Sequence, residues 1–367
     1  MTDPLRVLIV DDSATVRRVL RAMLESDPAI TVVGEAANGR EAIERVVELR
    51  PGLVILDVRM PVMDGVETTR QIMAYHPTPI LVVTASLSSY DIDITFQMLG
   101  AGALDLIEKP LLTDPGAIDT ARLVLIRKAK LLARVKVVTH LRGRRSELRI
   151  ENEEVRNAET RASKTLKPQF LSPNSQAPIL HSQFPVVVIG ASTGGPRVVR
   201  QILAGLPTTF GAAVVVVQHI AEGFSKGMVE WLAESMPMAV RLATENDQLV
   251  PGLVLVAPDR YDLLLKAGGR VHLSSQPLLL QRPAIDIAMQ SAAEAFGSRT
   301  IGVLLTGMGR DGALGMQTIR RVGGYTIAQD KDSCTIYGMP RAAIEQGAAS
   351  AILPPDQIIE ALRERVR

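Results

Sequence analysis

Short, largely apolar runs alternate with stretches of helical spacing, and this alternation constrains the fold of the chain more than any other feature. In the first third, apolar residues recur at helical spacing over Thr15–Leu24 and Arg40–Leu49. The shorter runs predict strands at Val7–Val10, Thr31–Val33, Leu53–Leu56, Ile80–Val83 and Ala103–Ile107. Strands that alternate with helices in this way predict a doubly wound parallel sheet.

The same alternation begins again at Val186, after a segment of different composition. Strands are predicted at Val186–Ile189, Ala213–Val217, Leu253–Val256, Ile301–Leu305 and Tyr325–Ala328. Helices are predicted at Pro196–Ala204, Phe224–Glu234, Ile285–Ala295, Ala313–Val322 and Pro340–Gln346. We therefore expect an α/β protein with two doubly wound parallel-sheet domains, at residues 1–123 and 183–367. A charged, partly helical linker should join them at residues 124–182.

Composition narrows the class of protein. The net charge of +2 is too small to predict a nucleic-acid partner, and the basic cluster Arg142, Arg144 and Arg145 lacks interleaved aromatic residues. No apolar run approaches ~18 residues, so we expect no direct membrane insertion. The one cysteine, Cys334, suits a reducing compartment, and the first residues lack the layout of a signal peptide. A cytoplasmic protein is expected.

Acidic residues follow two of the first strands. Asp11 and Asp12 come directly after the first strand, and Asp57 comes directly after the third. The carboxyl ends of adjacent parallel strands converge on one crevice, where three carboxylates predict a hard divalent cation, most plausibly Mg²⁺. Thr84 and Lys109 follow the fourth and fifth strands and suit an incoming phosphoryl group, with Asp57 as its acceptor. Taken singly, each Asp is more commonly a helix cap.

Residues 1–123 resemble the receiver domain of two-component response regulators, a flavodoxin-like fold. The resemblance is carried by VDDS, ILDVRMPVMDG, VVTAS and EKP. It implies that Asp57 is phosphorylated, that Asp11, Asp12 and Asp57 bind Mg²⁺, and that Thr84 and Lys109 hold the phosphoryl oxygens. Receivers usually carry Tyr or Phe three residues before the lysine, where this chain has Leu106. An aromatic switch coupled to Thr84 is therefore not expected, whereas phosphorylation is.

Three residue types needed for nucleophilic catalysis follow strands of the second sheet. Ser192 lies in GASTGG after the first strand, His219 ends the second, and Asp311 lies in the glycine-rich LLTGMGRDG. A serine nucleophile needs a base to take its proton and a third group to orient that base. The glycines around Ser192 would let a substrate carbonyl approach backbone N–H groups, and the turn at Met308 would offer another N–H to an oxyanion.

Other interpretations of these residues remain open at this level. GASTGG also suits a tight strand-to-helix turn or a phosphate cradle, although it lacks the lysine of a P-loop. Asp311 would serve equally as a helix cap, and Asp286 and Asp259 are rival third members of the triad. The order Ser, His, Asp disfavours the α/β-hydrolase fold.

Residues 183–367 resemble the catalytic domain of the chemotaxis protein-glutamate methylesterase (CheB) family, a Rossmann-like fold. The matching stretches are IGASTGGP, QHI, APDR, QRPAID, LLTGMGRDG and IYGMP. The resemblance implies a Ser192–His219–Asp311 triad, with N–H donors to the oxyanion at Met308 and, we expect, Thr193. It also implies esterase and glutamine deamidase activity on methyl-accepting chemotaxis receptors, without a cofactor for that reaction.

The same resemblance implies activation by phosphorylation, with a chemotaxis histidine kinase as phosphodonor. A DNA-binding regulator would need a helix-turn-helix and a basic surface, which the second half lacks. A non-catalytic receptor-binding adaptor, and the same chemistry in a signalling pathway other than chemotaxis, stay open.

Overall fold

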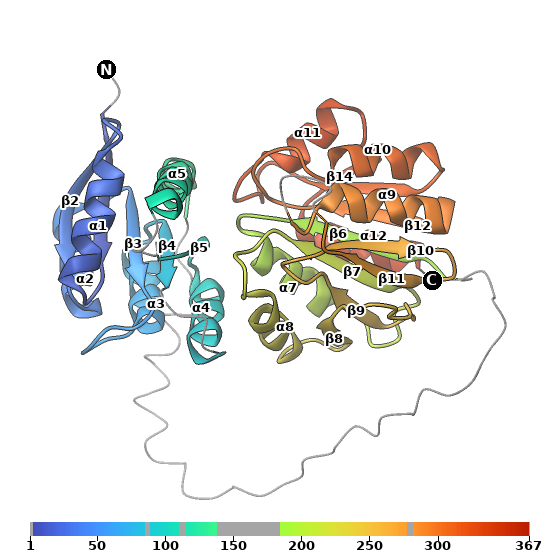
Figure 1. Cartoon of the computed structure of the whole chain (residues 1–367), viewed down its shortest axis with the longest axis horizontal. Helices are drawn as coiled ribbons and strands as arrows, with labels where there is room; N and C mark the ends of the chain where they lie inside the picture. The colour runs from blue at the N-terminus through green and yellow to red at the C-terminus, as the bar shows by residue number, and fades with distance from the viewer. Residues whose placement is uncertain (1–2, 85–88, 110–114, 138–183, 277–281, 367) are drawn as a thin grey trace, which may run out of the picture.

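The computed structural model describes residues 3–84, 89–109, 115–137, 184–276 and 282–366, which form two α/β lobes (Figure 1). We call residues 3–137 the N-terminal lobe and residues 184–366 the C-terminal lobe. Most of the expected linker, with Arg142, Arg144 and Arg145, lies outside the described residues. None of the described helices is both long enough and apolar enough to cross a membrane.

The N-terminal lobe is a five-stranded parallel sheet in the order β2-β1-β3-β4-β5. Its strands are β1 (Leu5–Val10), β2 (Ile30–Ala36), β3 (Leu53–Asp57), β4 (Ile80–Thr84) and β5 (Asp105–Glu108). Its helices are α1 (Ala14–Glu25), α2 (Gly39–Leu49), α3 (Gly65–Tyr75), α4 (Ser89–Ala101) and α5 (Pro115–Leu132). Side chains alternate across each strand, so α1 and α5 cover one face while α2, α3 and α4 cover the other. The predicted parallel sheet is confirmed.

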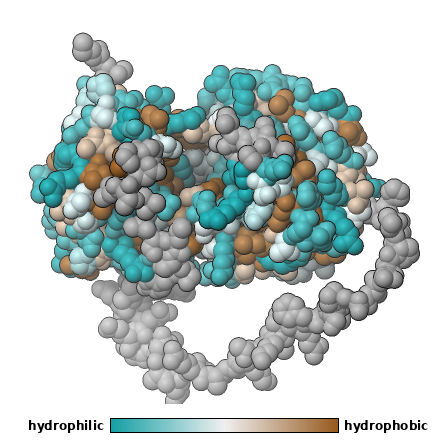
Figure 2. All heavy atoms as spheres, viewed as in Figure 1, coloured by the Kyte–Doolittle hydropathy of each residue, from teal (hydrophilic) through white to brown (hydrophobic). Residues whose placement is uncertain are grey.

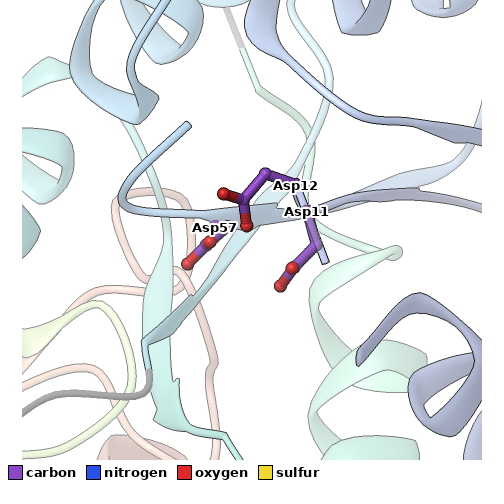
Figure 3. A group of neighbouring side chains, drawn as sticks. All are labelled: Asp11, Asp12 and Asp57. Carbon is purple, nitrogen blue, oxygen red and sulfur yellow. The ribbon is translucent and has the colours of Figure 1, made fainter. Parts of the chain in front are cut away.

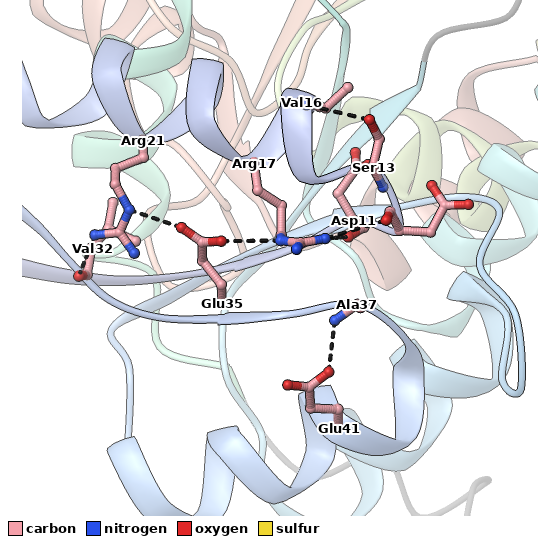
Figure 4. A network of polar contacts seen from close by, with 10 residues as sticks. Asp11, Ser13, Val16, Arg17, Arg21, Val32, Glu35, Ala37 and Glu41 are labelled. Carbon is pink, nitrogen blue, oxygen red and sulfur yellow. Dashed lines mark hydrogen bonds and ion pairs between the residues drawn. The ribbon is translucent and has the colours of Figure 1, made fainter.

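Local hydrogen bonds fix the first strand-to-helix turn (Figure 4). Ser13 caps α1 by accepting a hydrogen bond from the first turn, and its own N–H donates to Asp11 Oδ1 at 2.9 Å. Arg17 donates to the main-chain carbonyl of Asp11 at 2.7 Å. Arg17 and Arg21 also pair with Glu35 on β2, at 3.0 and 2.8 Å. These contacts hold α1 against β2 and place Asp11 at the edge of the sheet.

The C-terminal lobe is a seven-stranded parallel sheet in the order β14-β13-β12-β6-β7-β9-β8. Its strands are β6 (Val186–Ala191), β7 (Ala213–Gln218), β8 (Ala239–Leu242), β9 (Leu253–Val256), β12 (Thr300–Leu304), β13 (Tyr325–Gln329) and β14 (Ala351–Leu353). Its helices are α7 (Gly195–Gly205), α8 (Ser225–Ala233), α9 (Ile285–Phe296), α10 (Ala313–Arg321), α11 (Met339–Glu345) and α12 (Pro355–Arg365), with a short 3₁₀ helix at Gly297–Arg299. An antiparallel hairpin, β10 (Asp262–Lys266) and β11 (Arg270–Ser274), packs beside α9.

The core of this lobe follows from its valine-rich central strands. Val187 and Ile189 of β6 point toward α7, α8 and α12, whereas Val186 and Val188 point toward α9, α10 and α11. Residues buried on both faces produce the continuous apolar runs that predicted strands here. The sequence analysis missed β8, β14 and the hairpin. β8 lies at an edge and is half-buried, and β14 has only three residues, so neither produces a long apolar run.

The two lobes share an apolar interface between α4 and α8. The rings of Phe96 and Trp231 stack with centroids 5.5 Å apart, and the guanidinium of Arg200 lies 4.3 Å from the Trp231 ring centroid. A Cβ added at Gly227 would lie 1.8 Å from Ile92, so this glycine permits the close approach of the helices. On the face seen in Figure 2, hydrophilic residues cover most of both lobes and hydrophobic residues are scattered among them.

Candidate functional site

Three acidic side chains gather at the carboxyl edge of the first sheet. Asp11 and Asp12 follow β1, and Asp57 is the last residue of β3. One carboxylate oxygen from each lies within 4.8 Å of the other two, at the ends of neighbouring strands (Figure 3). Asp11 and Asp57 are buried, and Asp12 is exposed. The structure thus brings together the three carboxylates that the sequence predicts as metal ligands.

A lysine offsets part of this negative charge. Lys109 Nζ lies 2.7 Å from Asp11 Oδ2 and 2.9 Å from Asp57 Oδ2. Burial raises the pKa of Asp57 to about 6; Lys109 acts against this rise, and Asp11 adds to it. Burial alone would lower the pKa of Lys109, but its two carboxylate partners outweigh burial and raise it. Thr84 is buried at the end of β4, and its carbonyl accepts the Lys109 N–H at 2.7 Å.

The acidic cluster fits a small divalent cation. All of its donors are carboxylate oxygens, the ligands that Mg²⁺ prefers. Magnesium keeps several waters when it binds proteins, and the exposed side of the cluster, at Asp12, leaves space for them. Burial, together with the charge of Asp11, raises the pKa of Asp57 despite Lys109, and a bound cation would compensate the charge of this carboxylate.

In the C-terminal lobe, a histidine and an aspartate that follow different strands of the sheet contact each other. His219 follows β7, Asp311 precedes α10, and His219 Nε2 lies 2.8 Å from Asp311 Oδ2. Asp311 also accepts the N–H groups of Ile285 and Asp286, at 2.8 and 2.9 Å, at the start of α9. Burial would raise the pKa of Asp311, but the hydrogen bond and charge of His219 and these N–H groups lower it overall. Asp311 is therefore a fixed, ionised partner for the imidazole.

The two rival carboxylates lie elsewhere in the hydrogen-bond network. Asp259 accepts from the N–H of Gly223 and the hydroxyl of Ser225, at 2.7 and 3.0 Å. Asp286 accepts from the N–H of Gly315 at 2.7 Å, and burial raises its pKa to about 6. Neither is bonded to His219 in the part of the chain that the structure describes.

Ser192 lies in the same cavity as His219. The cavity has a volume of about 670 Å³, and its lining includes Ser192, Thr193, His219 and Met308. His219 Nδ1, the nitrogen not used by Asp311, is buried and makes no hydrogen bond within the described residues. The Ser192 main chain is fixed by its N–H, which donates to the carbonyl of Thr306 at 3.0 Å. A Cβ at Gly307 would lie 2.6 Å from the Cβ of Ser192, so only glycine fits there.

Buried amide and hydroxyl side chains support this loop, and the sequence analysis missed them. Gln218 Nε2 donates to the main-chain carbonyls of both Ser192 and His219, each at 2.8 Å. The Thr306 hydroxyl donates to the carbonyl of Thr193 at 2.9 Å. Gln329 accepts the N–H of Thr306 at 2.8 Å. The sequence signal for the two glutamines was a polar residue at the end of a largely apolar strand, as in VVVVQ and YTIAQ.

The N-terminal lobe closes one side of the cavity. The lining also includes residues of β5 and α5, among them Asp105, Leu106 and Lys128. Asp105 Oδ2 accepts the hydroxyl of Thr193 across the interface at 2.8 Å, and Lys128 Nζ approaches the same oxygen at 2.7 Å. Lys128 also donates to the carbonyl of Leu106 at 3.0 Å. A carboxylate of one lobe thus bonds to the residue that follows Ser192 in the other.

Comparisons with known proteins agree with this arrangement. Residues 7–119 match the family model of the response regulator receiver domain, and residues 187–362 match that of the CheB methylesterase. The chain is 40% identical to a protein-glutamate methylesterase/protein-glutamine glutaminase of Geobacter metallireducens, over 97% of each chain. It is 42% identical to one of Anaeromyxobacter dehalogenans, over 99% of this chain and 98% of the relative.

A solved structure matches the C-terminal lobe. The crystal structure of the CheB methylesterase catalytic domain of Thermotoga maritima is 41% identical in sequence, with a TM-score of 0.48. The match covers 50% of this chain and 98% of the Thermotoga domain. The relatives match nearly the full length of the chain, with the receiver region before the methylesterase region. The chain therefore belongs to the CheB family, in which a response regulator receiver domain is joined to a methylesterase domain.

Proposed function

We propose that this chain is a phosphorylation-activated protein-glutamate methylesterase and protein-glutamine glutaminase that acts on methyl-accepting chemotaxis receptors. One observation carries the chemical part of the proposal. His219 bonds to Asp311 through one imidazole nitrogen, and the other is buried without a partner among the described residues, next to the cavity that Ser192 lines. That arrangement supports an oriented base that shares its cavity with a hydroxyl nucleophile.

In the first half-reaction, Ser192 Oγ attacks the side-chain carbonyl of a glutamyl methyl ester. An ionised carboxylate only accepts hydrogen bonds, so the contact with Asp311 places the imidazole proton on Nε2 and the lone pair on Nδ1. Nδ1 is therefore the atom that accepts the serine proton and then gives it to the departing methoxide, which leaves as methanol. Asp311 stabilises the imidazolium that forms between these two transfers.

Backbone N–H groups of Thr193 and Met308 stabilise the oxyanion in this proposal. No described hydrogen bond uses either N–H, and both residues line the cavity. In the second half-reaction, His219 Nδ1 takes a proton from water, which attacks the acyl-enzyme and restores Ser192 and a free glutamate. The same steps with a glutamine side chain release ammonia instead of methanol.

In the receiver, Asp57 is the proposed phosphoacceptor, with a chemotaxis histidine kinase in the cytoplasm as phosphodonor. Asp11, Asp12 and Asp57 would hold Mg²⁺, which supplies charge compensation for phosphoryl transfer. Asp57 Oδ2 already faces Lys109 Nζ at 2.9 Å, so the lysine is placed to pair with a phosphoryl oxygen on that carboxylate. Thr84, at the end of the adjacent strand, would donate its hydroxyl to another phosphoryl oxygen.

The receiver restrains the esterase in the unphosphorylated chain. β5 and α5 close one side of the cavity, and Asp105 holds the hydroxyl of Thr193. Lys109, which contacts Asp57, follows β5 directly, so phosphorylation acts at the end of the strand that carries Asp105. Movement of β5 and α5 away from Thr193 would open the cavity to a receptor segment.

The test is methanol release from methylated receptor membranes by the full chain, with and without acetyl phosphate and Mg²⁺. We expect release that increases with the phosphodonor and falls by ~10⁴ or more in Ser192→Ala. Ser298→Ala, at an exposed serine, is the matched control and should keep wild-type turnover. Receptor binding without methanol or ammonia release would favour the adaptor alternative and refute the proposal. Turnover only with methylated proteins unrelated to chemotaxis would refute the choice of substrate.

A further inference from the structure

We propose that Gln218 is a positioning residue for ester hydrolysis: its side-chain amide turns the Ser192–Thr193 peptide so that the Thr193 N–H faces the oxyanion. The inference deepens the proposed function and rests on it. Gln218 touches neither substrate nor reacting atoms, and acts through the main chain of the residues that do.

The Gln218 side chain bridges the main chains of Ser192 and His219. It is the last residue of β7 and is only 3% exposed. Its Nε2 donates to the carbonyl of Ser192, which follows β6, and to the carbonyl of His219, which follows β7. Both distances are 2.8 Å, so a single amide group uses its two N–H donors on two main-chain carbonyls. This side chain adds two hydrogen bonds at the strand ends to the backbone bond from the His219 N–H to the Ala191 carbonyl, at 2.9 Å.

The hydrogen bond to Ser192 also helps to set the direction of the next N–H. In a trans peptide, the carbonyl of one residue and the N–H of the next point in opposite directions. The Ser192 carbonyl accepts both the buried Gln218 amide and the Gly195 N–H, each at 2.8 Å, so the Thr193 N–H points away from these two donors. No described hydrogen bond uses that N–H, and Ser192 and Thr193 line the cavity next to His219. The N–H is thus free to donate to the oxyanion that forms on attack by Ser192.

The other oxyanion donor is oriented in the same way. The carbonyl of Gly307 accepts the N–H groups of Gly338 and Met339, at 3.1 and 3.0 Å, at the start of α11. The Met308 N–H, in the same peptide as the Gly307 carbonyl, therefore points away from α11. Each proposed donor belongs to a peptide whose carbonyl accepts from a helix N-terminus, and the Ser192 carbonyl accepts in addition from Gln218.

Packing alone does not explain a glutamine here. Gln218 Oε1 is buried and has no hydrogen-bond partner within the described residues. A buried unsatisfied acceptor costs about 1–3 kcal/mol, which an apolar side chain would avoid. A Cβ on Gly195 would lie 2.3 Å from Oε1, so the loop also needs a glycine to make room for this amide. The unsatisfied Oε1 and the need for Gly195 are explained if the two Nε2 hydrogen bonds, to Ser192 and His219, are needed for function.

The experiment compares Gln218→Met and Gln218→Glu with the wild-type full chain, each activated with acetyl phosphate and Mg²⁺. Met keeps the length without any donor, and Glu keeps the shape with at most one donor, on its protonated carboxyl. Gln248→Met is the matched control, because Gln248 Nε2 also donates to main-chain carbonyls, including that of Gly268 at 2.7 Å, but lies outside the cavity lining. Rates are divided by the concentration of active serine, titrated with a fluorophosphonate. A boronic acid, which forms a tetrahedral adduct on serine, measures oxyanion binding.

We expect kcat per titrated serine to fall by ~10²–10³ in at least one folded Gln218 variant, as for loss of an oxyanion donor. KM should stay within about threefold, and boronic acid affinity should fall along with kcat. Gln248→Met should match the wild type in all three. Wild-type kcat per titrated serine in every folded Gln218 variant would overturn the inference, as would a rise in KM alone. Absence of turnover by the wild-type chain would instead refute the proposed function.

Discussion

The hydrogen bond between Asp105 and Thr193 should restrain the unphosphorylated enzyme, and its removal should activate it. Asp105→Ala deletes the acceptor. The Lys128 contact that is lost with it lies within the N-terminal lobe, so it affects that lobe rather than the equilibrium between closed and open cavities. Thr193→Val deletes the donor from the other side and leaves both the Asp105–Lys128 pair and the Thr193 N–H in place.

The size of the effect follows from the chemistry of this contact. A hydrogen bond to a charged group contributes about 1.5–3 kcal/mol, and 1.4 kcal/mol is a factor of ten. Loss of the contact should shift the equilibrium toward the open cavity by about 10- to 150-fold. Methanol release without phosphodonor should rise accordingly, up to the rate of the fully phosphorylated enzyme. Because both substitutions remove one bond, the double variant should be no more active than the better single variant.

The assay is the initial rate of methanol release from methylated receptor membranes without phosphodonor. Fluorescence of Trp231, the chain's single tryptophan, reports in parallel on separation of α4 and α8, because its ring stacks on Phe96. Asp119→Ala, at an exposed aspartate of α5 paired with Arg122, is the control and should keep the basal rate. Basal rates equal to wild type in both single variants, while phosphodonor still stimulates them, would refute the proposed restraint.

Three further predictions follow from the two sites. Asp57→Ala should keep basal methanol release and lose stimulation by acetyl phosphate; stimulation that survives would exclude Asp57 as the acceptor. Chelation of divalent cations with EDTA should abolish incorporation of phosphate from acetyl phosphate, with the basal esterase rate unchanged; undiminished incorporation would contradict a metal at Asp11, Asp12 and Asp57. Asp286→Asn should stabilise the C-terminal lobe. The pKa of Asp286 is raised to about 6, so its stabilising contribution is complete below pH ~4 and is lost as pH rises through ~6. The gain in unfolding free energy should be at most about 3 kcal/mol at pH 8 and vanish near pH 4, by urea denaturation; an equal gain at both pH values would contradict it.

Much of the fold was predictable because its strands are buried on both faces. The runs at Val186 and Ala213 are apolar throughout, and only a central parallel strand explains such a pattern. Residues at the carboxyl ends of parallel strands lie at one edge of the sheet, which predicted from the sequence that Asp11 lies near Asp57 and His219 near Asp311. Strand β8 escaped prediction because an edge strand is solvated on one side and needs no apolar run.

Parts of the site were beyond sequence reasoning for a different reason. The carbonyls that Gln218 binds belong to the main chain, and no pattern of side chains encodes which carbonyl an amide will meet. The contact between Asp105 and Thr193 depends on how two lobes meet, with 88 positions between its partners. The choice of Asp311 over Asp259 likewise required geometry, since both lie in loops after strands of one sheet.

The central claim is that hydrolysis passes through an ester on the Ser192 hydroxyl, formed with His219 as base. The most direct measurement is an acid quench during steady-state turnover of a methylated receptor fragment, followed by mass spectrometry of the peptide that contains Ser192. We predict a glutamyl adduct on Ser192 in the wild-type enzyme and its loss in His219→Ala. Methanol release without any adduct on Ser192, or with the adduct on another residue, would contradict the account.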